Sequence, residues 1–220
     1  MLAEELELAG LALLGGFHVA VGEHAALHLA AEVVTLALLG WPAPDHWRMF
    51  ASSPEYADGA ANPLDRWTRR VVDAIAADVG APPLYPFGGP PWQPFQTWAK
   101  RAGIARPSPI GLLIHPRYGL WHSYRAALAF ARPLVLPHAE AAEHPCDTCA
   151  DKPCLTACPV GAYSSDGFAV GDCRSYLTGH ADDCLSVGCH CRNACPVGRK
   201  YRYGPEQIVF HQRAFAGLGR

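Results

Sequence analysis

The 220-residue sequence predicts an α+β protein with an α/β amino-terminal part and a small carboxy-terminal module built around clustered cysteines. All nine cysteines fall between Cys146 and Cys195, which sets that stretch apart from the rest. The residues before it alternate between short apolar runs and segments with helical signals. We therefore expect an α/β domain at residues 1–140, the cysteine module at residues 141–204 and a closing helix at residues 205–220.

The amino-terminal part is predicted from its apolar runs and the residues that bound them. Residues 11–21 predict a strand, or a pair of strands around a Gly-Gly turn. Residues 24–39 are apolar on most sides, which favours a buried helix. Asn62 and Pro63 are typical of a helix start, with Asn62 as the capping residue, and that helix should end near Val79.

The rest of this part is expected to form a strand, a loop and a helix. The proline-rich residues 84–98 predict an ordered loop that leads into a short helix near Pro94. Residues 110–114 predict a buried strand, the HPRYG sequence after them a loop, and residues 120–131 a helix. Residues 133–145 then link this part to the cysteine module.

Charge and composition exclude several classes of function. The net charge is −2 and charged residues make up 17% of the chain, whereas nucleic-acid binding needs a basic face. The amino-terminus is acidic, and His28 and Glu32 interrupt the most apolar stretch, so neither a signal peptide nor a membrane span is expected. We expect a cytoplasmic protein without nucleic-acid or membrane partners. The odd cysteine count does not favour a disulfide framework.

The cysteine spacing predicts iron–sulfur clusters. The first half of the module reads C-x2-C-x4-C-x3-C-P, at Cys146, Cys149, Cys154 and Cys158. Bacterial ferredoxins have C-x2-C-x2-C-x3-C-P, in which the fourth cysteine ligates the other cluster of two-cluster proteins. The second half ends in a Cys-Pro-Val-Gly sequence at Cys195 that repeats the one at Cys158. The pattern predicts a ferredoxin-like module with two 4Fe–4S clusters. Zinc is the less favoured alternative, because paired C-x2-C zinc sites do not account for the Cys-Pro endings.

Crossed ligation divides the cysteines between the two clusters. The first cluster is expected to take Cys146, Cys149, Cys154 and Cys195. The second is expected to take Cys158 and three of the remaining four, which are Cys173, Cys184, Cys189 and Cys191. Because C-x-C is not a ferredoxin spacing, one of Cys189 and Cys191 should be spare. The x4 spacer after Cys184 repeats the x4 spacer of the first half and favours Cys189. The x3 spacer before Cys195 favours Cys191 instead. We assign Cys189 to the cluster.

Three segments resemble known families. The CRSYLT segment that begins at Cys173 resembles the start of the second half in epoxyqueuosine reductases, which join a cobalamin-binding domain to a ferredoxin-like domain with two 4Fe–4S clusters. Residues 114–121, IHPRYGLW, resemble the IHPRFGGW segment of CblC-type cobalamin-processing proteins. Residues 85–87 and Trp92 are similar to a second segment of that family. The resemblance covers residues 85–200 and implies a nitroreductase-related, CblC-like domain before the ferredoxin-like module.

The resemblance also implies a function. It implies a corrinoid, cobalamin, held by His115, Arg117, Tyr118, Gly119 and Trp121. A donor redox protein would supply electrons that reach the corrinoid through the clusters, as in a cobalamin-linked oxidoreductase. Epoxyqueuosine reduction itself is not expected, because the sequence shows no counterpart of the catalytic acid of those enzymes. The alternatives are a dicluster electron carrier without its own substrate and, ranked last, a flavin-linked reductase.

Overall fold

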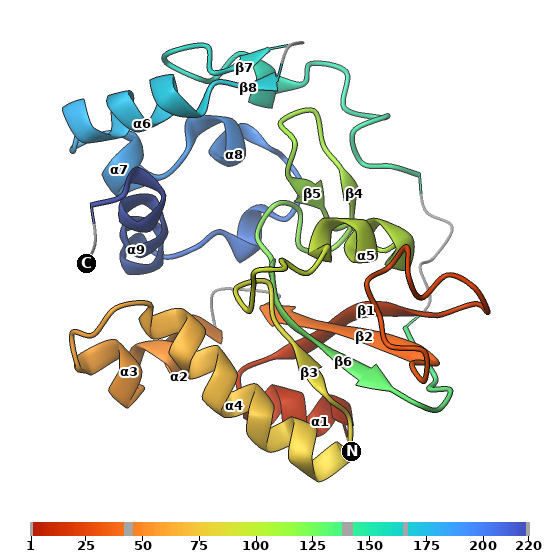
Figure 1. Cartoon of the computed structure of the whole chain (residues 1–220). Helices are drawn as coiled ribbons and strands as arrows, with labels where there is room; N and C mark the ends of the chain where they lie inside the picture. The colour runs from red at the N-terminus through yellow and green to blue at the C-terminus, as the bar shows by residue number, and fades with distance from the viewer. Residues whose placement is uncertain (1, 42–45, 138–142, 165–166, 219–220) are drawn as a thin grey trace. The chain divides into compact units, whose positions relative to one another are not determined.

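The structure of the chain is a computed structural model. It describes every residue except 1, 42–45, 138–142, 165–166 and 219–220. Two compact units share the chain (Figure 1). The amino-terminal unit comprises Met1–Ala105 and His122–Ala141, and the cysteine unit comprises Arg106–Trp121 and Ala142–Arg220. The division therefore differs from a single boundary near residue 140, because the segment that holds the HPRYG loop clusters with the cysteines.

A four-stranded antiparallel sheet forms the centre of the amino-terminal unit, with the strand order β1-β2-β6-β3. Its strands are β1 (Ala12–His18), β2 (Thr35–Trp41), β3 (Pro83–Leu84) and β6 (Ser123–Phe130). β1 is one strand with an irregularity between Leu13 and Gly16, so the strand prediction is confirmed and the alternative of a strand pair is wrong. The close approach of the β2 backbone requires a glycine at position 16, where a Cβ would lie 2.5 Å from the Leu36 carbonyl oxygen.

Two predicted helices are strands instead. β2 occupies the end of residues 24–39, and β6 occupies most of residues 120–131. All seven residues of β2 are buried, and β6 pairs with β2 on one side and β3 on the other. A strand covered on both faces loses the alternation of apolar and polar residues, so its sequence cannot be distinguished from that of a buried helix. Alanines such as Ala126 and Ala127 favour a helix locally, but pairing at the centre of the sheet overrides that preference.

The helices of this unit largely follow the prediction. They are α1 (Leu2–Leu8), α2 (Trp47–Ala51), α3 (Pro54–Ala57), α4 (Pro63–Val79) and α5 (Phe95–Ala102). α4 and α5 lie where the sequence predicts them. Asn62 is the N-cap residue of α4, as predicted, but it has a φ of 51° and its side chain makes no capping hydrogen bond. Three aromatic rings, Trp41, Phe50 and Trp67, meet in the core with centroids 5.7–6.0 Å apart.

The cysteine unit consists of short elements joined by turns. Its strands are β4 (Arg106–Pro107), β5 (Leu113–Ile114), β7 (Tyr163–Ser164) and β8 (Gly167–Phe168). Its helices are η2 (Pro153–Leu155), α6 (Val170–Gly179), α7 (Cys184–Val187), α8 (His190–Ala194), η3 (Arg199–Tyr201) and α9 (Pro205–Ala216). Only Leu113–Ile114 of the strand predicted at residues 110–114 forms, whereas the closing helix is confirmed as α9. That helix lies beside α6 and α7 (Figure 1). Among the described residues, no helix has the length and apolar character that crossing a membrane requires.

Candidate metal-binding sites

Four cysteines line one cavity of the cysteine unit. The cavity encloses about 370 Å³, part of it open to solvent, and its cysteines are Cys146, Cys149, Cys154 and Cys195. Cys154 lies in η2, and Cys195 directly follows α8. The 106–121 segment supplies apolar lining, including Ile114 and Leu120. The structure thus brings together the four thiols that the sequence groups as the first set.

The other five cysteines line a second cavity of about 330 Å³, also partly open. They are Cys158, Cys173, Cys184, Cys189 and Cys191. Polar side chains of Tyr163, Tyr176 and His190 lie at the same cavity. The backbone N–H of Ala162 donates to Cys158 Sγ at 3.2 Å, a contact of the kind that tunes iron–sulfur clusters.

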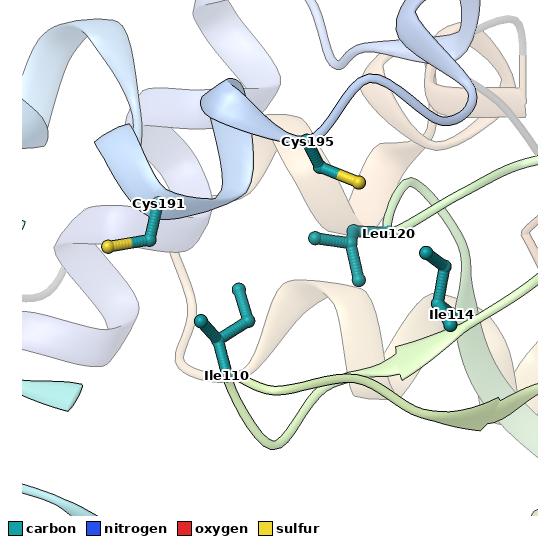
Figure 2. Packing of buried hydrophobic residues seen from close by; sticks show 5 residues of the cluster. All are labelled: Ile110, Ile114, Leu120, Cys191 and Cys195. Carbon is teal, nitrogen blue, oxygen red and sulfur yellow. The ribbon is translucent and has the colours of Figure 1, made fainter. Parts of the chain in front are cut away.

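The short helix α8 separates the two cavities. Cys191 lies within it and Cys195 at its end, and their sulfur atoms point to opposite sides (Figure 2). Both residues pack in one buried cluster with Ile110, Ile114 and Leu120. Cys195 therefore faces the first-half cysteines, while Cys158 faces the second-half cysteines. This crossed arrangement is the one that the ferredoxin spacing predicts.

The donor set fits a metal cluster. All nine cysteines lie among the described residues, and none forms a disulfide. Burial raises the pKa of the Cys146 thiol, and neighbouring Cys195 and Cys154 raise it further. The pKa of Cys173 in the second cavity is raised to about 11, first by burial and then by Cys189 and other thiols. Thiols held this close cannot all ionise unless a cation compensates their charge, and bound iron or zinc supplies that compensation.

Cys189 and Cys191 both line the second cavity, and a hydrogen bond joins their side chains. A hydrogen bond with the Cys191 thiol, above all, lowers the pKa of Cys189 to about 6. Hydrogen bonds from the backbone N–H groups of Arg192 and Cys191 and from the Tyr163 hydroxyl act in the same direction. The same hydrogen bond raises the pKa of Cys191, which is fully buried. The direction of these pKa shifts favours Cys189 as the thiolate and Cys191 as a hydrogen-bond donor to it.

The structure adds two residues that the sequence analysis missed. Ligand atoms of Asp183, Cys184 and His190 all lie within 4.8 Å of one another. His190 Nε2 is 2.5 Å from Asp183 Oδ1, and the Tyr176 hydroxyl donates to Asp183 Oδ2 at 2.6 Å. Oxygen, sulfur and nitrogen together suit a single zinc-like ion. The sequence signal was a histidine directly after Cys189 and an aspartate directly before Cys184.

The HPRYG loop is an ordered turn held by its histidine. A β-bridge joins His115 to Gly119, and His115 Nδ1 accepts hydrogen bonds from the backbone N–H groups of Arg117 and Tyr118 at 3.0 and 3.3 Å. Burial, together with the Arg117 charge, lowers the pKa of His115 to about 4. His115 is therefore neutral near pH 7, as an acceptor of two N–H groups must be.

Of the five residues assigned to a corrinoid, only some are accessible. Arg117 is exposed and Tyr118 is half-buried, whereas Gly119 and Trp121 are buried. The Arg192 guanidinium lies over the Trp121 ring at 4.4 Å and over the Tyr203 ring at 4.5 Å. Trp121 is thus engaged in the packing of the cysteine unit, and its ring does not form an open wall for a ligand.

Comparison with known proteins identifies the fold. No protein-family model and no curated protein sequence matches the chain. Among solved structures, it is similar to a Caenorhabditis elegans B12-trafficking protein, CblC, a homologue of human MMACHC, with a TM-score of 0.55 and 18% identity over 97% of this chain and 89% of that one.

It is also similar to epoxyqueuosine reductases. One has a TM-score of 0.55 and 13% identity over 94% of this chain and 67% of that one. Another, bound to a tRNA-Tyr stem loop, has a TM-score of 0.50 and 17% identity over 92% of this chain and 59% of that one. The chain therefore spans about 60% of the latter's length. At these identities the likeness shows the fold alone, and it confirms that this mixed α/β chain has a fold like that of CblC and the epoxyqueuosine reductases.

Proposed function

We propose that the protein is an iron–sulfur redox protein that holds two 4Fe–4S clusters and passes electrons to a bound corrinoid. The convergence of nine free thiols at two adjoining cavities, in the crossed arrangement of two-cluster ferredoxins, carries this proposal. Electrons would come from a donor redox protein. A 4Fe–4S cluster supplies one-electron transfer when bound.

Each cysteine has a proposed role. Cys146, Cys149, Cys154 and Cys195 hold the first cluster, and Cys158, Cys173, Cys184 and Cys189 hold the second. The chain's other residues tune these sites. The Ala162 N–H and the Cys191 thiol donate to ligand sulfurs, which stabilises their negative charge. Ile114 and Leu120 exclude water from the first cavity.

The corrinoid part of the proposal draws on the fold and on the HPRYG sequence. The C. elegans neighbour is a B12-trafficking protein, and the sequence of residues 114–121 resembles the same family. Within this loop we assign direct contact with the corrinoid to the side chains of Arg117 and Tyr118, because these are accessible. His115, Gly119 and Trp121 would set the shape of the loop.

A specific observation favours a second candidate function. If a single ion occupies Asp183, Cys184 and His190, a cluster in the second cavity would need both Cys189 and Cys191, and their C-x-C spacing is not that of a ferredoxin. The protein would then be a one-cluster electron carrier with a structural zinc ion. A dicluster carrier without a corrinoid is the remaining alternative.

Metal and sulfide analysis of anaerobically reconstituted protein separates these functions. We expect about eight irons and eight sulfides per chain. About four irons with one zinc would favour the single-ion alternative. Cobalamin added at micromolar concentration should then change the visible absorption spectrum of the reconstituted protein. Eight irons without any cobalamin response would leave the dicluster carrier and contradict the corrinoid step.

A further inference from the structure

A group of unpaired positive charges lies on the cysteine unit beside the first cavity. The segment from residue 184 to residue 205 contains four basic residues and no Asp or Glu. Arg192 is used internally, where it donates to the Leu120 carbonyl oxygen and lies over the rings of Trp121 and Tyr203. The other three, Arg199, Lys200 and Arg202, are exposed. With exposed Arg117 they form what we call the basic surface.

Backbone packing fixes the two loops that carry the basic surface. A Cβ on Gly119 would lie 2.1 Å from the Val197 carbonyl oxygen, and one on Gly198 would lie 2.4 Å from the Tyr118 carbonyl oxygen. Arg117 Nε donates to the Tyr201 hydroxyl at 2.9 Å. The 115–119 loop and the turn around η3 therefore lie against each other, and the backbone that carries the four basic residues is in place before any partner arrives.

Carboxylates elsewhere in the chain neutralise arginines, but not here. Arg66, Arg70 and Arg125 each form an ion pair with an aspartate or glutamate. Within the residues that the structure describes, no carboxylate forms an ion pair with any member of the basic surface. The protein thus has a net charge of −2 but concentrates four uncompensated cations in one place.

The basic surface adjoins the first cluster site. Pro196 and Val197, which line the first cavity, connect Cys195 to the turn that carries Arg199. A partner seated on the basic surface would therefore stand beside the thiol that closes the first site.

We infer that the basic surface docks an acidic electron-carrier protein that delivers electrons at the Cys195 side of the first site. This inference rests on the proposed iron–sulfur function. Opposite charges steer such an encounter and raise its rate. RNA is the less suitable partner, because its phosphates demand a larger basic footprint and the chain as a whole is anionic.

Stopped-flow reduction of the reconstituted protein tests the inference, with reduced plant-type ferredoxin as the acidic probe. The double variant Arg199→Glu/Lys200→Glu should lower its second-order rate constant about tenfold or more at low salt, and added salt should slow the wild-type reaction. Lys100→Glu, an exposed lysine of the amino-terminal unit, is the matched control and should behave like the wild type. Reduction by photoreduced 5-deazariboflavin, which has no net charge, should be equal in all variants.

Several outcomes distinguish the possible failures. A double variant that ferredoxin reduces as fast as the wild type, or a wild-type rate that salt does not change, would overturn the inference. A third result would also overturn it. A tRNA stem loop would shift the wild-type protein but not the double variant on a native gel, and ferredoxin would reduce both proteins at the same rate. Wild-type protein that takes up no iron would instead contradict the proposed function.

Discussion

Cys191 and Cys195 extend from the same short helix, yet their sulfur atoms point to opposite sides and line different cavities (Figure 2). Side chains that are four residues apart on one helix normally lie on a common face. Here α8 ends at Ala194, and Cys195 has already left the helical conformation, with a ψ of 126°. Because α8 ends before Cys195, the Cys195 thiol joins the first site while the Cys191 thiol lies at the second.

Cys195→Ala should remove the first cluster and leave the second, because Cys195 is the only ligand that the second half gives to the first cavity. The iron content should fall from about eight to about four per chain. Cys158→Ala is the reciprocal variant and should remove the second cluster. Cys146→Ala should leave the same cluster spectrum as Cys195→Ala, and a spectrum that matches that of Cys158→Ala instead would contradict the crossed assignment.

Cys191→Ala should retain both clusters, whereas Cys189→Ala should lose one. The hydrogen bonds at Cys189 stabilise its thiolate, while the thiol of Cys191 serves as one of the donors. Because Cys191→Ala removes a hydrogen bond to a ligand sulfur, the potential of the second cluster should also become more negative. Iron analysis and a redox titration followed by electron paramagnetic resonance measure both effects. The reverse pattern of iron loss would make Cys191 the ligand.

Lys152→Asn should lower the reduction potential of the first cluster by roughly tens of millivolts. Lys152 lines the first cavity, and its positive charge favours the more negative, reduced state. It belongs to the spacer that is two residues longer than in bacterial ferredoxins and has a φ of 39°, a conformation that asparagine tolerates. Lys100→Asn is the control for loss of a lysine charge. A redox titration in which both variants keep the wild-type potential would exclude an electrostatic role for Lys152.

The cysteine groups could be predicted from the sequence, but the strands around them could not. The spacing of cluster ligands is a local property of the sequence. The proline after Cys158 and after Cys195 indicates that each of these cysteines belongs with the cysteines of the other half. β2 and β6 are strands because they pair with each other, and this long-range pairing cannot be read from a short stretch of sequence. The grouping of Asp183 with His190 escaped prediction for the same reason, because a turn between α7 and α8 brings these residues together.

Acid should destabilise the protein partly through His115. Its pKa is lowered to about 4 by burial, whereas an unfolded histidine titrates near 6.5. The unfolded state therefore binds a proton first, so stability is lost as pH falls from about 6.5 towards 4, by about 2 kcal/mol at pH 5. His115→Asn keeps an acceptor for the N–H groups of Arg117 and Tyr118 without titrating. Anaerobic urea unfolding at pH 7.5 and pH 5 should show a smaller loss in this variant than in the wild type.

Arg192→Lys should destabilise the cysteine unit by about 1–3 kcal/mol, although the charge is retained. The guanidinium donates through Nε and Nη2 to the Leu120 carbonyl oxygen, at 3.0 and 2.5 Å, and lies over both the Trp121 and the Tyr203 rings, which contact each other. A lysine cannot make both hydrogen bonds or stack its head group on two rings. Arg199→Lys, at an exposed position, is the matched control and should leave the urea unfolding midpoint unchanged. Equal midpoints for both variants would mean that Arg192 does not hold the 106–121 segment to the cysteine loops, and that its other contacts suffice, among them the packing of Ile110, Ile114 and Leu120 against Cys191 and Cys195.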